Sequence, residues 1–243
     1  MRSYLPTMSY LDQEGPDPSP SFRAILSKLS IFRNTAPEAQ RDIAARLVMR
    51  KRQAGSQIMA QDEPSDSLFI IQRGRVRQVI HGDNGRQMSL GVLGPGDFFG
   101  EMSAFDGQAR GVAVEAIEDT TVLVLGREQL FEHLQKFPAT AVTFLVEMSR
   151  RMRKQNELIA NLALRDVGVR LARKLLDLAR EDGGEEEGCP VIRRRPTQQE
   201  LADMVGSCRE TVSRAMTGFA RKGLVRVSGR SLTLSAELLS LAA

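Results

Sequence analysis

The stretch from Thr197 to Gly223 predicts two helices joined by a tight turn, and it constrains the fold more than any other segment. Two capping-box patterns, a Ser or Thr followed three residues later by Glu, mark the helix starts. They are Thr197 with Glu200 and Ser207 with Glu210. Apolar residues recur at helical spacing in both halves, as Leu201, Met204 and Val205 and then as Val212, Met216 and Phe219. Gly206 lies between them, where a left-handed or tight backbone is needed.

A helix-turn-helix of this kind places its second helix in the major groove of DNA. Arg can donate two hydrogen bonds to guanine, and Glu can accept one from cytosine N4, so the residues that start the second helix favour G·C base pairs. We expect the DNA contacts to come from Thr197, Gln198, Ser207, Cys208, Arg209, Glu210, Thr211, Ser213, Arg214, Arg221 and Lys222. The alternative is a helical hairpin packed inside a domain, with its arginines on an ordinary solvated face.

Positive charge is concentrated around this motif. The whole chain carries 34 Lys and Arg against 30 Asp and Glu, a net charge of +4. Between Cys189 and Arg230 lie nine cationic and three anionic residues, a net +6, so the remainder carries a net −2. The charge that attracts phosphates therefore coincides with the helix-turn-helix, which favours nucleic acid over a membrane surface as the partner.

The composition is that of a globular protein with more than one domain. The 243 residues suffice for two domains, and apolar residues make up 42%. No apolar run approaches the ~20 residues of a membrane span, and no apolar stretch follows Arg2 as in an export signal. Cys189 and Cys208 form neither a metal-ligand cluster nor a disulfide framework, so we expect no metal site and a cytoplasmic location.

No catalytic residues are expected, and the protein is predicted not to be an enzyme. The sequence has no GxSxG, P-loop or HExxH motif and no Cys/His pair at catalytic spacing. An iron–sulfur cluster would need a group of N-terminal cysteines, and residues 1–60 contain none. Haem would need an axial histidine, but His81 is interpreted as solvent-facing in a hairpin turn and His133 as a packing or surface residue.

The chain is predicted to be an α+β protein of four segments. These are a proline-rich arm (1–20), a sensor domain (21–137), a dimerisation helix with a hinge (138–165) and a winged helix-turn-helix domain (166–243). In the sensor domain, residues 22–50 are predicted to be helical with a break at Pro37. Short strands with glycine turns over residues 52–126 predict an antiparallel β-roll. In the last domain, we expect a solvated loop at 181–188 and a two-stranded wing after Gly223.

The long helix is predicted to begin at Pro138 and to carry a heptad seam, with spacings that alternate between three and four. The seam consists of Leu145, Met148, Met152, Gln155, Ile159 and Leu162. This pattern is typical of two paired helices, and a dimer would supply the two half-site readers of a helix-turn-helix protein. The alternative is that the stripe packs on the protein's own β-roll.

In the order of its segments, the chain resembles the CRP/FNR superfamily of bacterial transcription regulators across residues 22–240. The sharpest local matches are CRETVSRAM, FFGEMSAFDGQAR and NLALRDVGVRLARKLLDLA. The resemblance implies a homodimer that binds double-stranded DNA at a two-fold symmetric operator with TGTGA-like half-sites, together with RNA polymerase. By position, it implies base contacts from Arg209, Glu210 and Arg214 and a phosphate contact from Cys208.

The same resemblance implies a cyclic-nucleotide pocket for cyclic AMP, cyclic GMP or cyclic di-GMP. Its residues are Gly100, Glu101, Met102, Arg110 and Gly111 in the roll and Gln155 and Asn156 on the long helix. Arg110 would pair with the phosphate, and Glu101 would accept from a ribose hydroxyl. Gly111 departs from the cyclic AMP-type pattern, which has Ser or Thr there, and Gln155–Asn156 departs from its adenine-reading Thr-Ser pair.

Three interpretations of the roll remain open. It gates DNA binding through a cyclic nucleotide, or it belongs to a constitutively active regulator without a small-molecule effector, or it is a sensing module that controls a partner protein. Gln155 itself lies on the seam. It therefore either reads a nucleotide base or forms a polar layer that sets the register of the paired helices.

Overall fold

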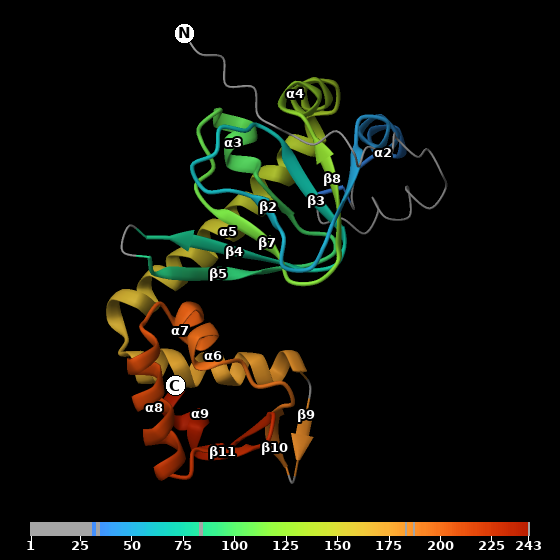
Figure 1. Cartoon of the computed structure of the whole chain (residues 1–243). Coiled ribbons are helices and arrows are strands. Elements are labelled where there is room, and N and C mark those ends of the chain that lie inside the picture. Colours follow the sequence, from blue (N-terminus) through green and yellow to red (C-terminus); the bar gives the residue numbers. More distant parts are fainter. Residues whose placement is uncertain (1–30, 33–34, 83–84, 183, 187, 243) are drawn as a thin grey trace. The chain divides into compact units, whose positions relative to one another are not determined.

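The computed structural model describes residues 31–32, 35–82, 85–182, 184–186 and 188–242 (Figure 1). The chain divides into two compact units, residues 1–80 with 91–151 and residues 81–90 with 152–243. The predicted arm at 1–20 and the first part of the predicted 22–50 helix lie outside the described residues. The four segment boundaries drawn from the sequence stay predictions.

The N-terminal elements form two four-stranded sheets with helices. In chain order they are α2 (Pro37–Ala44), β1 (Val48–Arg52), β2 (Gln57–Met59), β3 (Leu68–Arg73), β4 (Val76–His81), β5 (Gln87–Leu93), β6 (Phe98–Phe99), α3 (Glu101–Asp106), β7 (Ala113–Ala116), β8 (Thr120–Leu125) and α4 (Arg127–Lys136). One sheet has the order β1-β8-β3-β6 and the other β2-β7-β4-β5 (Figure 1). The strand pairs whose registers are known are antiparallel, as expected for the predicted β-roll.

The roll has two cores because successive side chains of a strand face opposite sides of its sheet. On the helix-covered side, the β3 residues Leu68 and Ile70 pack with Leu123 and Leu125 of β8, Leu130 of α4 and Phe144 of the long helix. On the other side, between the two sheets, Ile71 and Val122 pack with Met59, Val76, Phe99 and Val114. Both cores are close to fully buried.

The C-terminal elements follow the long helix α5 (Pro138–Leu164), which begins at the predicted proline. They are α6 (Val167–Asp182), β9 (Gly184–Glu186), β10 (Cys189–Ile192), α7 (Gln198–Val205), α8 (Arg209–Arg221), β11 (Val225–Ser228), β12 (Ser231–Leu234) and α9 (Ala236–Ala242). The strands form one antiparallel sheet of order β11-β12-β10-β9. The apolar sides of α6, α7 and α8 meet in a buried core with Leu232 and Leu234 of β12, so these helices and the β11–β12 wing form one unit.

Two predictions of local structure were wrong. The helix predicted up to residue 50 ends at Ala44, and Val48–Arg52 is strand β1, paired with β8. Pro37 starts this helix, because a proline in the first turn loses no intrahelical hydrogen bond. The segment predicted as a solvated loop contains strand β9, because the backbone at 184–186 pairs with β10 while the Glu185 and Glu186 side chains stay exposed.

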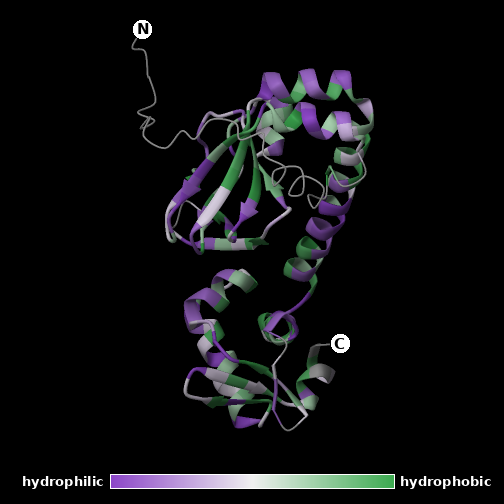
Figure 2. Cartoon of the chain, turned by 90° about the vertical axis from the view of Figure 1, so that its right-hand side faces the viewer, coloured by the Kyte–Doolittle hydropathy of each residue, from purple (hydrophilic) through white to green (hydrophobic). Residues whose placement is uncertain are grey.

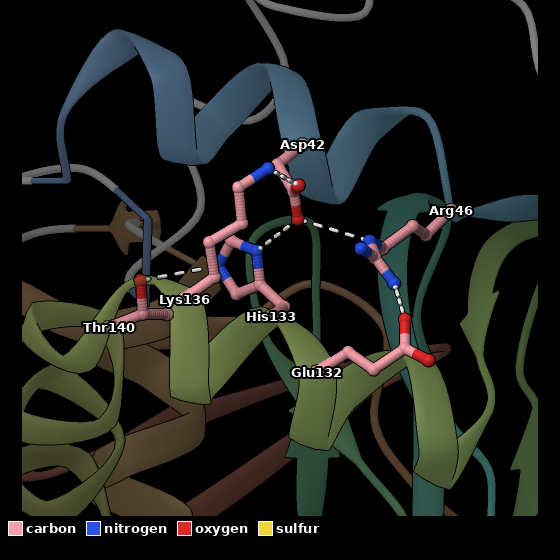
Figure 3. Close-up of polar contacts among 6 residues, drawn as sticks. All are labelled: Asp42, Arg46, Glu132, His133, Lys136 and Thr140. Carbon is pink, nitrogen blue, oxygen red and sulfur yellow. Dashed lines mark hydrogen bonds and ion pairs between the residues drawn. The ribbon is translucent and has the colours of Figure 1, made fainter.

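A polar cluster joins α2, α4 and the first turn of α5 (Figure 3). His133 and Thr140 are fully buried. The His133 ring contacts Asp42 Oδ2 through Nδ1 at 2.9 Å and Thr140 Oγ1 through Nε2 at 3.3 Å. Asp42 also accepts hydrogen bonds from Lys136 Nζ at 2.7 Å and from Arg46 Nε at 3.0 Å. His133 is therefore a buried packing residue, one of the two roles expected of it.

Burial and hydrogen bonding together set the protonation states of His133 and Asp42 in this cluster. Burial lowers the pKa of His133, although the adjacent Asp42 opposes that effect. Burial also disfavours ionisation of Asp42, but hydrogen bonds from Lys136, His133 and Arg46 outweigh it and lower the pKa of Asp42 to about 2. The folded protein thus holds an ionised aspartate beside a neutral histidine at neutral pH.

Candidate DNA interface and effector pocket

The helix-turn-helix forms largely as predicted. The Thr197 hydroxyl accepts from the Glu200 backbone N–H at 3.1 Å, and the Glu200 carboxylate accepts from the Thr197 N–H at 2.6 Å, so this capping box is confirmed. Gly206 is left-handed, with φ of 62°. The second capping box is wrong, because α8 begins at Arg209 and its N-cap is Cys208. The Ser207 backbone N–H still bonds to the Ala202 carbonyl at 3.0 Å, which keeps Ser207 in the turn that closes α7.

Cys208 is a weaker cap than the predicted serine. Its side chain makes no capping bond to the helix backbone, and its Sγ lies 3.1 Å from the Thr211 hydroxyl. That hydroxyl lowers the pKa of Cys208. A backbone N–H likewise lowers the pKa of Glu210. Glu210 is therefore an ionised hydrogen-bond acceptor at the start of α8.

One face of α8 is buried and the other carries the predicted reading residues. Val212, Met216 and Phe219 belong to the core, whereas Arg209, Glu210 and Arg214 are exposed. Of the other predicted DNA-contacting residues, the exposed ones are Thr197, Gln198, Arg221 and Lys222, and the half-buried ones are Ser207, Cys208, Thr211 and Ser213. In the described part of the chain, no carboxylate pairs with Arg209 or Arg214. Arg214 Nη2 donates to the Thr211 hydroxyl at 3.2 Å, a neutral partner that leaves its charge unpaired.

Further cations lie at the edge of the same unit. The Arg195 backbone N–H donates to the Arg230 carbonyl at 2.8 Å, which brings the segment before α7 to the turn between β11 and β12. The exposed cations there are Arg193, Arg194, Arg195, Arg226 and Arg230. Positive charge therefore extends from the helix-turn-helix to the wing, as a phosphate-binding surface requires.

Arg110 is the best-defined residue of the predicted effector pocket. It is 1% exposed. Its Nη1 donates to the Gly100 carbonyl at 2.7 Å, and its Nη2 donates to Ser65 Oγ at 2.9 Å and to the Ser67 carbonyl at 2.7 Å. Its Nε is buried and has no hydrogen-bond partner among the described residues. Burial lowers the pKa of Arg110, but an arginine stays protonated at neutral pH. A buried cation with an unused donor suits an anionic ligand.

Gly100 and Glu101 shape the wall beside Arg110. Gly100 has φ of 80°, and a Cβ there would lie 2.7 Å from Arg110 Nη1 and 2.8 Å from the Ser67 carbonyl oxygen. The position therefore admits only glycine. Glu101 is 8% exposed and pairs with Arg151 of α5, whose Nη1 lies 3.0 Å from Glu101 Oε1.

Arg151 was not among the predicted site residues. Its Nη2 donates to the Phe98 carbonyl at 2.6 Å, and its Cζ lies 3.9 Å from the centroid of the Phe98 ring. The sequence shows Arg151 only as one of several cations beside the seam. Nothing local indicated that it would pair with a glutamate 50 positions earlier.

The remaining predicted effector residues are exposed. Met102 is 63% exposed, and Gly111, Gln155 and Asn156 are also exposed. Gln155 lies one helical turn after Arg151 on α5. In the single chain, Gly100 and Arg110 therefore contact each other. No side-chain hydrogen bond of Gln155 or Asn156 is found among the described residues.

The predicted seam of α5 is mostly uncovered in the single chain. Leu145, Met152 and Ile159 are 66%, 63% and 62% exposed. Met148 and Leu162 are half-buried, and Met148 packs on the core of the roll. Figure 2 shows hydrophobic and hydrophilic residues interspersed along α5. An apolar face of this exposure is typical of a surface that another protein chain covers.

Among the described residues, no group of three or more His, Cys, Asp and Glu side chains could hold a metal ion. No described helix is both long and apolar enough to cross a bilayer.

Comparison with known proteins identifies the family. Residues 49–137 match the cyclic nucleotide-binding domain, and residues 169–239 match the Crp-like helix-turn-helix domain. The CRP-like cAMP-activated global transcriptional regulator of Mycobacterium tuberculosis is 33% identical over 211 residues, which cover 87% of this chain and 94% of that protein. The chain belongs to the CRP/FNR superfamily of transcription regulators.

Other relatives agree with this assignment. The cyclic AMP receptor protein of Thermus thermophilus is 32% identical over 198 residues, which cover 81% of this chain and 88% of that protein. The crystal structure of the Thermus thermophilus catabolite activator protein gives a TM-score of 0.52 at 30% identity, covering 88% of this chain and 98% of that one. The c-di-GMP responsive regulator CLP of Xanthomonas campestris shares the fold, with a TM-score of 0.73 at 24% identity over 83% of this chain and 100% of that one.

The protein is therefore a CRP-type transcription regulator that binds DNA through its helix-turn-helix. These relatives are regulators and not enzymes, in line with the lack of a catalytic motif in the sequence.

Proposed function

We propose that this regulator is a homodimer that reads a palindromic operator with TGTGA-like half-sites and acts with RNA polymerase in the cytoplasm. The exposed set Arg209, Glu210 and Arg214 on α8 carries the proposal, because it lies opposite a buried apolar face. These residue types suit G·C pairs. The exposed seam of α5 would pair two copies and so present two reading helices to half-sites about 34 Å apart, one turn of DNA.

Fluorescence anisotropy with labelled duplexes tests the DNA part. The full chain should bind a duplex with two TGTGA-type half-sites far more tightly than a scrambled duplex of the same composition at ~150 mM salt, where non-specific binding weakens. Equal affinity for both duplexes would reject the proposed operator.

Sedimentation tests the dimer with a matched pair of variants. Met152→Lys places a charge on the seam, and Met102→Lys places the same charge on α3 at the same 63% exposure. Only Met152→Lys should shift the protein from dimer to monomer, because only it buries an unpaired charge between helices. A wild-type chain that is monomeric at micromolar concentration contradicts the dimer.

A cyclic nucleotide in the roll is the second part of the proposal. The buried Arg110 with its unpartnered Nε has the charge and the unused donor that suit a phosphate, and Gly100 leaves room for the guanidinium group at this position. The Glu101 carboxylate can accept a hydrogen bond from a ribose hydroxyl. The protein already supplies three partners for Arg110, and this observation favours the competing function of a regulator active without an effector.

Calorimetric titration of the full chain with cyclic AMP, cyclic GMP and cyclic di-GMP separates the two functions. Heat of binding with one of them, together with a change in operator affinity, supports gating. No heat with any of the three, together with tight operator binding by the unliganded chain, supports the effector-free regulator.

A further inference from the structure

We infer that Ser65 supplies the hydroxyl that position 111 lacks, so that an anion at Arg110 is held by the Asp62–Ser67 loop and not by the residue after Arg110. The inference rests on the proposed cyclic-nucleotide function and assigns a ligand-contacting residue to that pocket. Gly111 offers no side-chain donor. Ser65, 45 positions earlier in the chain, lies beside the same guanidinium group.

The Asp62–Ser67 loop is bonded to both the backbone and the side chain of Arg110. The Asp62 N–H donates to the Arg110 carbonyl at 2.8 Å, and the Arg110 N–H donates to the Glu63 carbonyl at 3.1 Å. Arg110 Nη2 donates to Ser65 Oγ at 2.9 Å and to the Ser67 carbonyl at 2.7 Å. These four bonds hold the Ser65 hydroxyl in place before any ligand arrives.

Ser65 and Arg110 each have an unused hydrogen-bond donor that suits a phosphate. A serine hydroxyl can accept hydrogen bonds and donate one. Ser65 Oγ accepts from Arg110, and no acceptor for its own O–H is found in the described part of the chain. Arg110 Nε–H is buried and also has no partner among the described residues. One O–H and one N–H therefore remain unused around one fixed positive charge, and Ser65 is only half-buried.

The alternative is that Ser65 only positions the arginine. Gly111→Ser separates the two roles, because it restores a hydroxyl next to Arg110 without restoring the Ser65–Arg110 bond. If Ser65 donates to the ligand, Gly111→Ser should rescue a chain that lacks the Ser65 hydroxyl. If Ser65 only positions Arg110, it should not.

The experiment is calorimetric titration of the full chain with cyclic AMP, cyclic GMP and cyclic di-GMP. Ser65→Ala should weaken binding of the nucleotide that the wild type prefers by ~10- to 100-fold, the range for a hydrogen bond to a charged group. The double variant with Ser65→Ala and Gly111→Ser should recover most of that loss, and Ser65→Thr should bind like the wild type. Ser56→Ala is the matched control, because its half-buried hydroxyl bonds to the Gln53 carbonyl elsewhere in the roll. It should change the affinity less than ~2-fold.

The outcomes separate this inference from the function on which it rests. Equal affinities of Ser65→Ala and Ser56→Ala, with clear wild-type binding, overturn the role of Ser65 and leave the nucleotide function intact. A large loss that Gly111→Ser does not rescue also overturns it and leaves Ser65 as a positioning residue. A wild type that binds none of the three nucleotides overturns both the inference and the proposed gating. Circular dichroism melting of each variant shows whether a loss of affinity reflects unfolding.

Discussion

Removing the charge of Asp42 should destabilise the roll in a pH-dependent way. Asp42 accepts hydrogen bonds from Lys136, Arg46 and His133, and its side chain is 9% exposed (Figure 3). Asp42→Asn keeps the shape of the side chain and removes the charge that balances Lys136 and Arg46. The effect arises at Asp42, because its nearly buried carboxylate loses the charge-assisted hydrogen bonds that hold it ionised.

The magnitude follows from the pKa of Asp42. A fall from 3.8 to about 2 corresponds to about 2.5 kcal/mol of folding free energy at neutral pH. The Asp42 carboxyl group binds a proton more weakly in the folded state than in the unfolded state. The contribution is therefore fully present above pH 3.8 and is lost as the pH falls toward about 2. Burial likewise lowers the pKa of His133 below its ordinary value of 6.5. The folded state therefore gains no stability from His133 protonation, and its free energy of unfolding declines as the pH falls below 6.5.

Urea unfolding of the full chain, followed by far-UV circular dichroism at several values between pH 7 and pH 2, measures this effect. Hydrogen exchange of peptides that cover α2 and α4 localises it to the roll. Asp42→Asn should lose about 2.5 kcal/mol at pH 7 and converge on the wild type near pH 2. Asp177→Asn is the control, because its ion pair with Arg180 is exposed and its loss should cost at most ~0.5 kcal/mol.

Two results would refute this reasoning. Equal losses in Asp42→Asn and Asp177→Asn would show that the buried cluster stabilises the roll no more than a surface pair does. A loss in Asp42→Asn that persists unchanged at pH 2 would show that the shape of the side chain matters and its charge does not.

Two further predictions concern the proposed sites. Arg209→Ala should weaken operator binding by about 1–3 kcal/mol and relax base preference, whereas Lys222→Ala should weaken binding to all sequences about equally, and anisotropy with cognate and scrambled duplexes distinguishes them. If both variants lose the same affinity for both duplexes, α8 does not read bases through Arg209. Gly100→Ala should cost more stability than Gly55→Ala in thermal melts, because both have φ near 80° but only Gly100 lacks space for a Cβ. Equal melting temperatures would mean that the packing at Gly100 adjusts freely.

The helix-turn-helix was predictable because its signals are local. Thr197 and Glu200 bond each other three residues apart, and Gly206 adopts its left-handed turn within the same segment. The start of α8 was misplaced by one residue because Ser207 and Cys208 are adjacent and the hydrogen bond to Ala202 decides between them. The choice between two neighbouring caps thus depends on how the preceding helix closes.

Strands were harder to predict where their partners are distant. Val48–Arg52 has no alternation that marks a strand, and it becomes β1 because β8, some 70 positions later, offers an open edge. Gly184–Glu186 is too acidic to suggest a strand, yet its backbone pairs with β10 while its carboxylates remain in water. In both places the backbone pairing determines the structure and the side chains give little indication of it.

The candidate effector pocket shows the same limit. Resemblance to the family identified Gly100, Glu101 and Arg110, but it could not identify Ser65 or Arg151, because their contacts span 45 and 50 positions of sequence. Arg151 adds a structural consequence, since its neighbour Met152 lies on the exposed predicted seam while Arg151 itself bonds to Glu101. The helix α5 therefore supplies a side chain of the pocket wall and, at the next position in the sequence, a residue of the predicted seam.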